Sequence, residues 1–380
     1  MANPSLSLYV HVPFCVKKCL YCDFYSVPYE KFLADDFIQT VVKEWALVKK
    51  EKNLEDPTLQ TLFIGGGTPS VLSVEQWKSM HRALTSQFNL AQGIEWTIEC
   101  NPDSFTQEKA QLWHSMGVTR LAFGVQSFVD EELRILGRPH FAGEAFAALH
   151  SPALRQFNSI GLDIMYGLPN QTIDSFEKTL AAALSAQIVK HLSAYELTIC
   201  ENSPFGREKN LPLPDEDTVC DMARLIFRKC REAGFERYEI SNFAKEGHRC
   251  RHNEAYWNHE PYIGLGPGAH SYVHPKRWAN IGDVKKYVSM INDGKRAIDF
   301  EETIDKKKLA DEMIFLSLRT SDGLDEKNFS KNTGEQFYSG NRKKVLEDML
   351  REKLIIHEKS RWSLTEKGML LTDSIVKKLI

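Results

Sequence analysis

The first 235 residues of the chain alternate six times between short β-prone runs and longer segments with helical periodicity. This order predicts a parallel sheet with crossover helices, because parallel strands need connections long enough to hold a helix. Six units are too few to close an eight-stranded barrel. The strands are expected at 6–12, 61–64, 95–99, 120–124, 159–165 and 192–196, and the helices at 35–50, 73–88, 106–116, 173–186 and 215–233.

Motifs rich in cysteine, glycine or polar side chains follow the ends of these predicted strands. In barrels of parallel strands, the C-terminal strand ends carry the binding and catalytic residues. Residues that only pack a core would not be expected to recur at this position. We therefore expect a functional site formed by segments 15–22 and 65–68 together with Glu99, Gln126 and Asp163.

Three cysteines, Cys15, Cys19 and Cys22, follow the first predicted strand at C-x3-C-x2-C spacing. Thiolates are soft ligands, so this spacing suggests zinc or an iron–sulfur cluster. Three cysteines can hold three irons of a [4Fe–4S] cube and leave the fourth iron open to a small molecule. A zinc knuckle and three unrelated buried cysteines are the alternatives, although a structural zinc site needs four ligands.

Composition narrows the class of protein. Hydrophobic residues make up 42% and charged residues 26%, which is ordinary for a globular chain. The net charge of −3 gives no signal for nucleic acid, and we expect no such partner. No apolar run reaches the roughly 18 residues of a membrane span, and the polar segment 1–5 is unlike a signal peptide. A reducing cytoplasm is expected because the other cysteines are scattered and form no disulfide framework: Cys100, Cys200, Cys220, Cys230 and Cys250.

The alternation of strands and helices stops after about residue 235, which predicts three domains. Residues 1–235 are expected to hold the parallel sheet with its crossover helices, and residues 236–300 an extension with an irregular loop at 248–257. Residues 301–380 are expected to form a small winged-helix-like α+β domain of helices and a hairpin at 354–364. Residues 340–380 hold ten Lys and Arg against six Asp and Glu, and we expect docking rather than DNA binding.

The cysteine motif, followed by an aromatic residue, resembles the signature of the radical S-adenosylmethionine (SAM) superfamily. In that superfamily SAM chelates the open iron of a [4Fe–4S] cluster, and an electron from the reduced cluster cleaves SAM to a 5′-deoxyadenosyl radical. The longer string Tyr-x-His-x-Pro-Phe-Cys at 9–15 resembles oxygen-independent coproporphyrinogen III oxidases and their HemW-type heme chaperone relatives. The resemblance implies an α/β fold in which residues 1–235 form an open (β/α)6 partial barrel and the extension at 236–300 closes it.

The resemblance also implies how the glycine turn binds SAM. Gly66, Gly67 and Thr68 lie in the turn that binds the SAM amino group through its backbone. Glycine suits such a turn because it lets a ligand approach the main chain closely. Glu99 would accept hydrogen bonds from the amino group or the ribose. A glycine turn after a strand is also common without a ligand.

Five further residues match cofactor-contacting positions of the oxidase. Gln126, Arg138 and Asp163 match polar SAM contacts in order and spacing. Arg138 would pair with a carboxylate, and Asp163 would hold ribose hydroxyls. Tyr9 and Tyr21 match positions that stack near the cofactors. Some of these positions serve a second SAM molecule in the oxidase, so one and two SAM molecules both stay open.

Two departures distinguish the chain from the oxidase. Phe24 stands where the oxidase carries a fourth cysteine, and only 14 residues precede Cys15, where the oxidase has a long N-terminal segment. The string from His252 to Trp257 instead matches H-N-x-x-Y-W, which is associated with the heme-chaperone branch. Imidazole is a common ligand of heme iron, and aromatic rings pack on porphyrins. His252 is thus the predicted axial ligand, with His270 and Cys250 as rivals and a purely structural histidine as the other interpretation.

We therefore expect a cytoplasmic, HemW-like radical SAM heme chaperone that binds a [4Fe–4S] cluster, SAM and heme. Its expected partners are apo-heme proteins such as respiratory enzymes, and a reductant such as flavodoxin or ferredoxin. Whether the chain is an enzyme stays open, because a coproporphyrinogen oxidase and a radical SAM enzyme acting on heme are the alternatives. Peripheral membrane contact and a homodimer stay open as well.

Overall fold

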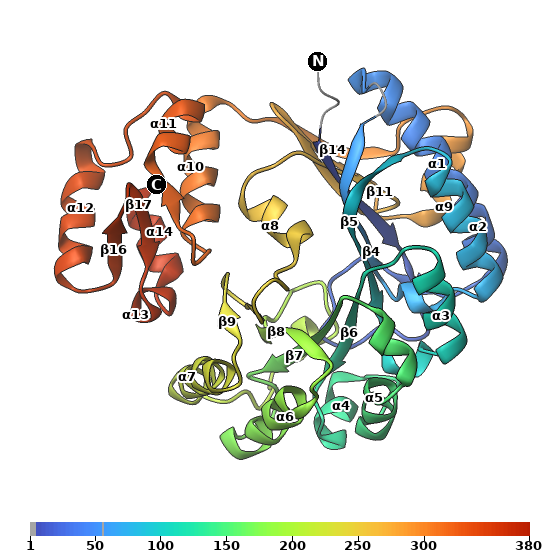
Figure 1. The fold of residues 1–380 in the computed structure, drawn as a ribbon, viewed down its shortest axis with the longest axis horizontal. Helices are drawn as coiled ribbons and strands as arrows, with labels where there is room; N and C mark the ends of the chain where they lie inside the picture. The colour runs from blue at the N-terminus through green and yellow to red at the C-terminus, as the bar shows by residue number, and fades with distance from the viewer. Residues whose placement is uncertain (1–4, 55–56) are drawn as a thin grey trace.

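The computed structural model describes residues 5–54 and 57–380, and its largest feature is a twelve-stranded sheet with helices along its outer side (Figure 1). Its middle strands are parallel, as the alternation predicts. They are β1 (Ser5–Val12), β4 (Thr58–Gly66), β5 (Asn89–Cys100), β6 (Arg120–Gln126), β7 (Ser159–Tyr166) and β8 (Val189–Glu196).

The crossover helices cover the outer side of these strands. A capping box at Ser73 and Gln76 starts the second helix, as the sequence predicts. Two short helices between β6 and β7 were not predicted from the sequence, because each spans only about two turns and shows too little periodicity. The helices are α1 (Lys31–Lys52), α2 (Val74–Thr85), α3 (Gln107–Ser115), α4 (Asp130–Leu136), α5 (Ala142–Leu149), α6 (Ile173–Ser185) and α7 (Glu216–Glu232).

The segment after α7 extends the sheet at both ends. At one end β9 (Glu236–Arg237) and β10 (Asn242–Ala244) are antiparallel to β8. At the other end β11 (Tyr262–Leu265) is parallel to β1 and is followed by three antiparallel strands and a helix. These are β12 (His270–Val273), β13 (Lys276–Asn280), α9 (Val284–Asn292) and β14 (Ile298–Thr303).

The order of the sheet is β14-β13-β12-β11-β1-β4-β5-β6-β7-β8-β10-β9. Its terminal strands, β14 and β9, do not pair with each other, so the described residues form an open partial barrel. The predicted fold class is therefore confirmed.

The prediction of an irregular loop at 248–257 is wrong in part, because Arg251–Trp257 forms the helix α8. The helix depends on a residue that is distant in the sequence. The Glu95 carboxylate of β5 accepts hydrogen bonds of 3.0 Å from the backbone N–H groups of Arg251 and His252, which open this helix. A negative side chain at a helix N-terminus satisfies unpaired N–H groups and matches the helix dipole.

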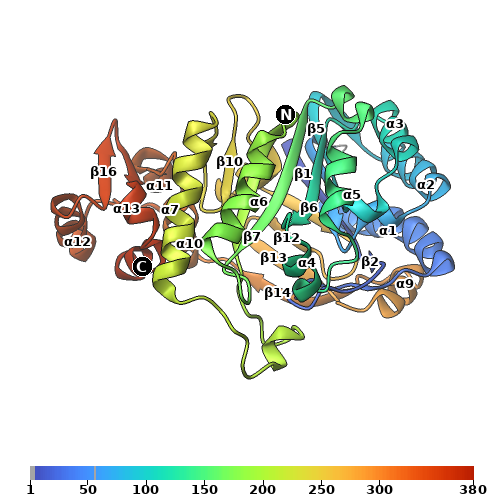
Figure 2. The same cartoon turned by 90° about the horizontal axis from the view of Figure 1, so that it is seen from below.

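Residues 304–379 build a second hydrophobic core, which Tyr272 of β12 joins. The hairpin predicted at 354–364 is present. Figure 1 and Figure 2 show the C-terminal module, residues 304–379, at one end of the molecule. Glu312 connects this module to the sheet extension, because its Oε2 lies 2.8 Å from His259 Nε2 and 2.5 Å from Arg277 Nη2. The elements are α10 (Lys306–Ser317), β15 (Leu324–Asp325), α11 (Glu326–Thr333), α12 (Gly340–Arg351), β16 (Ile355–Glu358), β17 (Arg361–Leu364), α13 (Glu366–Met369) and α14 (Thr372–Leu379).

Across residues 5–54 and 57–380, none of the helices combines the length and the apolar character that a membrane crossing requires.

Candidate cofactor site

The cysteine loop starts where β1 ends. Two short strands, β2 (Phe14–Cys15) and β3 (Val27–Pro28), pair in parallel and close the loop at its base. Cys15, Cys19 and Cys22 all line one cavity of about 520 Å³. The fold therefore brings the three predicted ligands together at the C-terminal ends of the parallel strands.

Two neighbouring side chains donate hydrogen bonds to these sulfur atoms. Thr68 Oγ1 lies 3.4 Å from Cys15 Sγ, and Arg138 Nη1 lies 3.3 Å from Cys19 Sγ. Burial raises the pKa of Cys15, and it raises the pKa of Cys22 to about 11. These thiols therefore lose their protons mainly when a metal takes the place of the proton. Hydrogen bonds to the sulfurs are one way in which proteins tune iron–sulfur clusters.

This donor set fits an iron–sulfur cube better than a single metal ion. Within the described ranges, no three His, Cys, Asp or Glu side chains converge on one ion position. A structural zinc ion needs four converging ligands, whereas a [4Fe–4S] cube takes each cysteine at a different iron. The arrangement therefore fits the cluster that the radical SAM resemblance implies, with each cysteine available to a different iron.

The glycine turn after β4 is a close crossing of backbone segments. Gly66 has a φ of +107°, and a Cβ there would lie 2.6 Å from the ring of His11. A Cβ at Gly67 would lie 2.7 Å from the carbonyl oxygen of Phe14. Contacts within the protein therefore already require both glycines, so the motif alone is not evidence for a ligand. Both glycines and Thr68 nevertheless line the cysteine cavity.

Two largely buried carboxyl groups, Glu99 of β5 and Asp163 of β7, line the same cavity. Burial, reinforced by the charge of Asp163, raises the pKa of Glu99 to about 8. Burial also raises the pKa of Asp163 to about 6, against a hydrogen bond from Ser193. Perturbed carboxyl groups in a cavity are suited to binding a cation or a hydrogen-bond donor.

Arg138 links the cysteine loop to the ends of β5 and β6. Its Nη2 donates hydrogen bonds to Asn101 Oδ1 at 2.9 Å and to the Gly124 carbonyl at 2.5 Å. Its Nε is buried without a partner in the described part of the chain. Buried donors normally have partners, so this N–H group suits the carboxylate that the sequence predicts for Arg138.

The remaining predicted residues divide between two cavities. Gln126, with a φ of +70° at the end of β6, and Tyr21 line the cysteine cavity. Tyr9 lines an adjoining cavity instead. Sequence reasoning missed Asn101 and Tyr195, which line the cysteine cavity from the ends of β5 and β8. The signal that located the other motifs, a polar residue at a strand end, would have found both.

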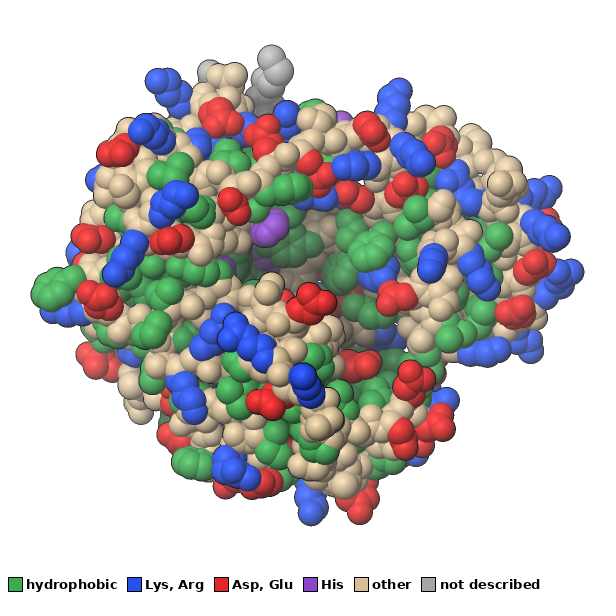
Figure 3. Space-filling model, turned by 180° about the vertical axis from the view of Figure 1, so that it is seen from behind, with side chains coloured by type: hydrophobic (Ala, Val, Ile, Leu, Met, Phe, Trp, Pro, Cys, Tyr) green, Lys and Arg blue, Asp and Glu red, His purple; other side chains and the backbone are tan. Residues whose placement is uncertain are grey.

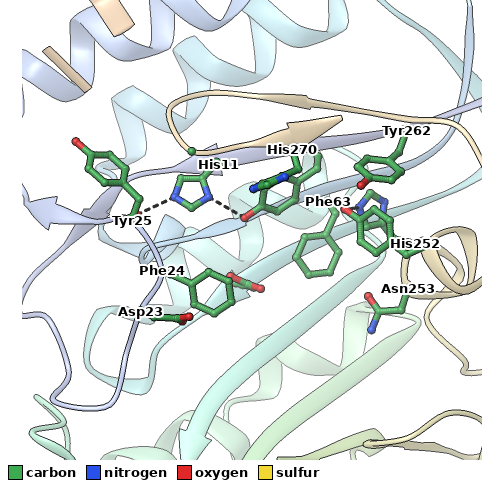
Figure 4. Close-up of a pocket in the computed structure, with 13 residues that line it drawn as sticks. His11, Asp23, Phe24, Tyr25, Phe63, His252, Asn253, Tyr262 and His270 are labelled. Atoms are coloured by element: carbon green, nitrogen blue, oxygen red, sulfur yellow. Dashed lines mark hydrogen bonds between the residues drawn. The ribbon is translucent and has the colours of Figure 1, made fainter. Parts of the chain in front are cut away.

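The adjoining cavity has a volume of about 630 Å³ and is lined mainly by aromatic and imidazole side chains (Figure 4). Phe63, Tyr256 and Tyr262 belong to its wall, whereas Trp257 does not. Asp23, Phe24 and Glu99 line both cavities, so the two spaces share a wall. Figure 3 shows a hollow in one face of the molecule, with apolar side chains inside it and a histidine at its rim.

His252 is held firmly in the wall of this aromatic cavity. Its Nδ1 lies 2.7 Å from Thr61 Oγ1, and its Nε2 lies 2.8 Å from the hydroxyl of Tyr256. Its ring stacks on Phe63 with 5.0 Å between the centroids, and burial lowers its pKa to about 3. Both ring nitrogens are therefore occupied by protein groups in this conformation. The rival Cys250 is buried, and its thiol contacts the carboxylate of Glu95.

Two family models match the chain. The radical SAM superfamily model matches residues 9–183, and the HemN C-terminal domain model matches residues 304–371. The heme chaperone HemW of Bacillus subtilis is 35% identical over 377 residues, which cover 97% of each chain. The heme chaperone HemW of Escherichia coli is 37% identical over 276 residues, which cover 71% of each chain.

The solved structure of coproporphyrinogen III oxidase from Escherichia coli, described as a radical SAM enzyme, matches with a TM-score of 0.86. The match covers 100% of this chain and 91% of the oxidase at 22% identity. At that identity the likeness concerns the fold alone.

Proposed function

The chain belongs to the HemW heme chaperone family of radical SAM proteins, and from this premise we propose that it binds heme and passes it to apo-proteins. The observation that carries the proposal is the aromatic cavity beside the cysteine cavity. Its volume of about 630 Å³ lies in the usual range for cofactor sites.

The chemistry of the cavity wall suits a porphyrin. Aromatic rings such as Phe63 and Tyr262 supply flat apolar surfaces for the macrocycle, and imidazoles are common ligands of heme iron. Among the residues that the structure describes, the lining includes the acidic Asp23 and Glu99 but neither Lys nor Arg. A heme propionate buried without a cationic partner would lose its hydration without compensation, so we expect the propionates to point out of the cavity and the apolar edge to point inward.

We further propose that Cys15, Cys19 and Cys22 hold a [4Fe–4S] cluster. When bound, such a cluster supplies an electron and an open iron for SAM. The chain itself holds Cys15 and Cys19 through hydrogen bonds from Thr68 and Arg138. A flavodoxin or ferredoxin is the proposed reductant, whereas membrane contact and a homodimer stay predictions.

We propose that SAM lies in the rest of the cysteine cavity. Arg138 would offer its unpaired Nε to the carboxylate of SAM, and Glu99 and Asp163 would accept hydrogen bonds from its amino and hydroxyl groups. The backbone of Gly66 and Gly67 would border it. Tyr21 and Gln126 complete this site, while Tyr9 and His252 belong to the heme side.

The oxidase alternative is less well supported. Phe24, which stands where related oxidases carry a cysteine, is 62% exposed and lies in the wall shared by the two cavities. A phenyl ring offers neither a thiol for chemistry nor a proton. Phe24 suits contact with a flat apolar ligand instead.

The test is a heme-transfer assay with the anaerobically reconstituted protein. Heme-loaded protein is mixed either with the apo-form of a respiratory heme protein or with apo-myoglobin, which captures released heme. Transfer to the respiratory acceptor should be faster than passive release into apo-myoglobin. Equal rates, or an absence of saturable heme binding, would contradict the proposed function.

A further inference from the structure

Three histidines, His11, His252 and His270, line the aromatic cavity, and they differ in what their ring nitrogens contact. We propose that His270, rather than His252, supplies the imidazole that binds heme iron. This inference rests on the proposed function, because it presumes that heme enters this cavity. It assigns the iron-binding role to a residue outside the H-N-x-x-Y-W string.

His11 is engaged at both ring nitrogens. Its Nε2 lies 2.8 Å from the carbonyl oxygen of Tyr25, which can only accept a hydrogen bond, so Nε2 carries the proton. Its Nδ1 then accepts the hydroxyl of Tyr9 at 3.0 Å. The ring is also 3% exposed. Iron binding at His11 would break one of these bonds and leave a buried polar group without a partner.

His252 is engaged in the same way, by Thr61 and Tyr256. It is 1% exposed and packs against Phe63. To reach iron, the ring would have to leave its stacking partner and give up at least one hydrogen bond. Its place in the structure is that of a positioning residue, which orients the hydroxyl of Tyr256 at the cavity wall.

His270 is different on every count. Its side chain is exposed, and within the described residues it has no hydrogen-bond partner. Figure 4 shows its ring beside the cavity, with Phe24 and Phe63 both on one side of it. Partial desolvation of the ring, followed by the charge of Arg277, lowers its pKa from the ordinary value, which favours the neutral imidazole. A neutral imidazole with a free nitrogen is the form that binds a metal.

The backbone beneath His270 is fixed, although the side chain is free. His270 begins β12 and pairs with Ala279 of β13. A Cβ on Gly264 of β11 would lie 2.1 Å from the carbonyl oxygen of His270, so these two strands touch only because Gly264 has no side chain. Ser271 Oγ further accepts a hydrogen bond of 2.9 Å from the N–H of Gly264. The imidazole therefore extends from backbone that is held on both sides by neighbouring strands, as suits a metal ligand.

Other side chains that could bind heme iron at the cavity are weaker candidates. The phenol of Tyr262 would have to lose its proton, and burial raises its pKa. Cys250 does not line the cavity and contacts Glu95. Tyr25 directs its hydroxyl to the backbone N–H of Val284 at 2.7 Å. Among the described residues that line the cavity, His270 is thus the one imidazole that could bind iron without first giving up a hydrogen bond.

The test is an anaerobic heme titration of the cluster-loaded protein, recorded as difference spectra against protein without heme. The variants are His270→Ala, His252→Gln, which keeps a polar side chain, and His150→Ala just after α5 as a matched control outside the cavity. His270→Ala should lose the histidine-type Soret spectrum and weaken heme binding at least tenfold, since loss of even a secondary metal contact costs roughly 10–100-fold. Added imidazole should restore the spectrum of His270→Ala, a result that a merely structural role would not produce.

His150→Ala should keep the wild-type spectrum and affinity. His252→Gln should keep the histidine-type Soret band of bound heme, whatever change in affinity the altered cavity wall causes. A wild-type spectrum in His270→Ala, together with a changed one in His252→Gln, would overturn the assignment while leaving heme binding intact. If the wild-type protein itself binds no heme, the proposed function fails, and this inference fails with it. The two failures are therefore distinguishable in one experiment.

Discussion

The Glu99 carboxylate accepts a hydrogen bond of 2.9 Å from the backbone N–H of Gly66, and the same side chain lines both cavities. One residue thus holds the glycine turn beside the cysteines and forms part of the wall of the aromatic cavity. Changes at Glu99 or Gly66 should therefore affect the stability of the site as well as its ligands.

The first prediction concerns the charge of Glu99. Folding raises the pKa of Glu99 from 4.5 to about 8, so the folded chain holds this proton across a window in which the unfolded chain has released it. The free energy of unfolding should therefore fall as the pH rises from about 5 to 8, by at most about 5 kcal/mol at roughly 1.4 kcal/mol per unit of pKa. Glu99→Gln keeps an acceptor for the N–H of Gly66 but does not titrate, so this variant should not show the fall in the free energy of unfolding between pH 5 and pH 8. Thermal unfolding of cluster-free protein at pH 5 and pH 8 measures it, with the exposed Glu358→Gln as control; parallel pH profiles for wild type and Glu99→Gln would contradict the prediction.

The second prediction concerns the turn itself. Gly66→Ala places a Cβ against His11 at a φ of +107° and should lower the free energy of unfolding by about 2 kcal/mol or more. Gly143 in α5 has no atom within 4 Å of its Cβ position, so Gly143→Ala should instead stabilise the helix by about 0.5–1 kcal/mol. Chemical denaturation of wild type and both variants measures these differences in the free energy of unfolding. A Gly66→Ala protein as stable as wild type would show that the turn relaxes freely.

The third prediction concerns the cluster. Wild-type protein reconstituted anaerobically should hold about four irons per chain, and Cys19→Ser should lose most of them. Cys230→Ser, a change at a buried cysteine away from the cavity, is the matched control and should keep the iron. Iron analysis and electron paramagnetic resonance give the answer. Purified protein that carries only zinc would refute the assignment.

The fourth prediction concerns SAM. Asp163→Asn removes a charged acceptor, and a hydrogen bond to a charged group contributes about 1.5–3 kcal/mol, so SAM affinity should fall roughly 10–100-fold. Calorimetry on cluster-loaded protein measures the change. Asp174→Asn, at the start of α6, should leave the affinity as it is. An unchanged affinity in Asp163→Asn would place SAM elsewhere.

The fifth prediction separates the chaperone from the oxidase. With reduced cluster and SAM, the protein should release no carbon dioxide from coproporphyrinogen III, because Phe24 takes the place of the oxidase cysteine. Chromatography of the porphyrins after oxidation detects any protoporphyrin product. An authentic oxygen-independent oxidase under the same conditions is the positive control. Robust decarboxylation by this chain would favour the oxidase reading.

Much of the fold could be predicted because its signals are local. The strand β6 carries a continuous apolar run, β7 is apolar on both sides of Asp163, and the capping box at Ser73 is contained within four residues. The short helix α8 could not be predicted in this way, because its N-terminus is closed by Glu95, more than 150 residues earlier in the chain. Tertiary contacts override weak local propensity in such segments.

The candidate site shows the same division. The cysteine spacing, the glycine turn and the polar residues at strand ends identify the positions that carry chemistry, because parallel strands direct their C-terminal ends to one side of a sheet. Their shared cavity follows from that topology. The sequence cannot tell that Gly66 is required by His11, or that Glu99 belongs to two cavities, since both facts depend on side chains from different strands.

By itself, the sequence determined the parallel sheet with its crossover helices, the three cysteines in one loop and the family-like order of polar residues, since each is written in neighbouring residues or in a repeated pattern. Only the tertiary structure decided which histidine is free. Thr61 and His252 are 191 residues apart, yet their 2.7 Å hydrogen bond occupies the imidazole that the motif had marked as a ligand. His270, which the sequence offered only as a rival ligand, lines the cavity from the start of β12, where within the described residues its ring nitrogens have no hydrogen-bond partner.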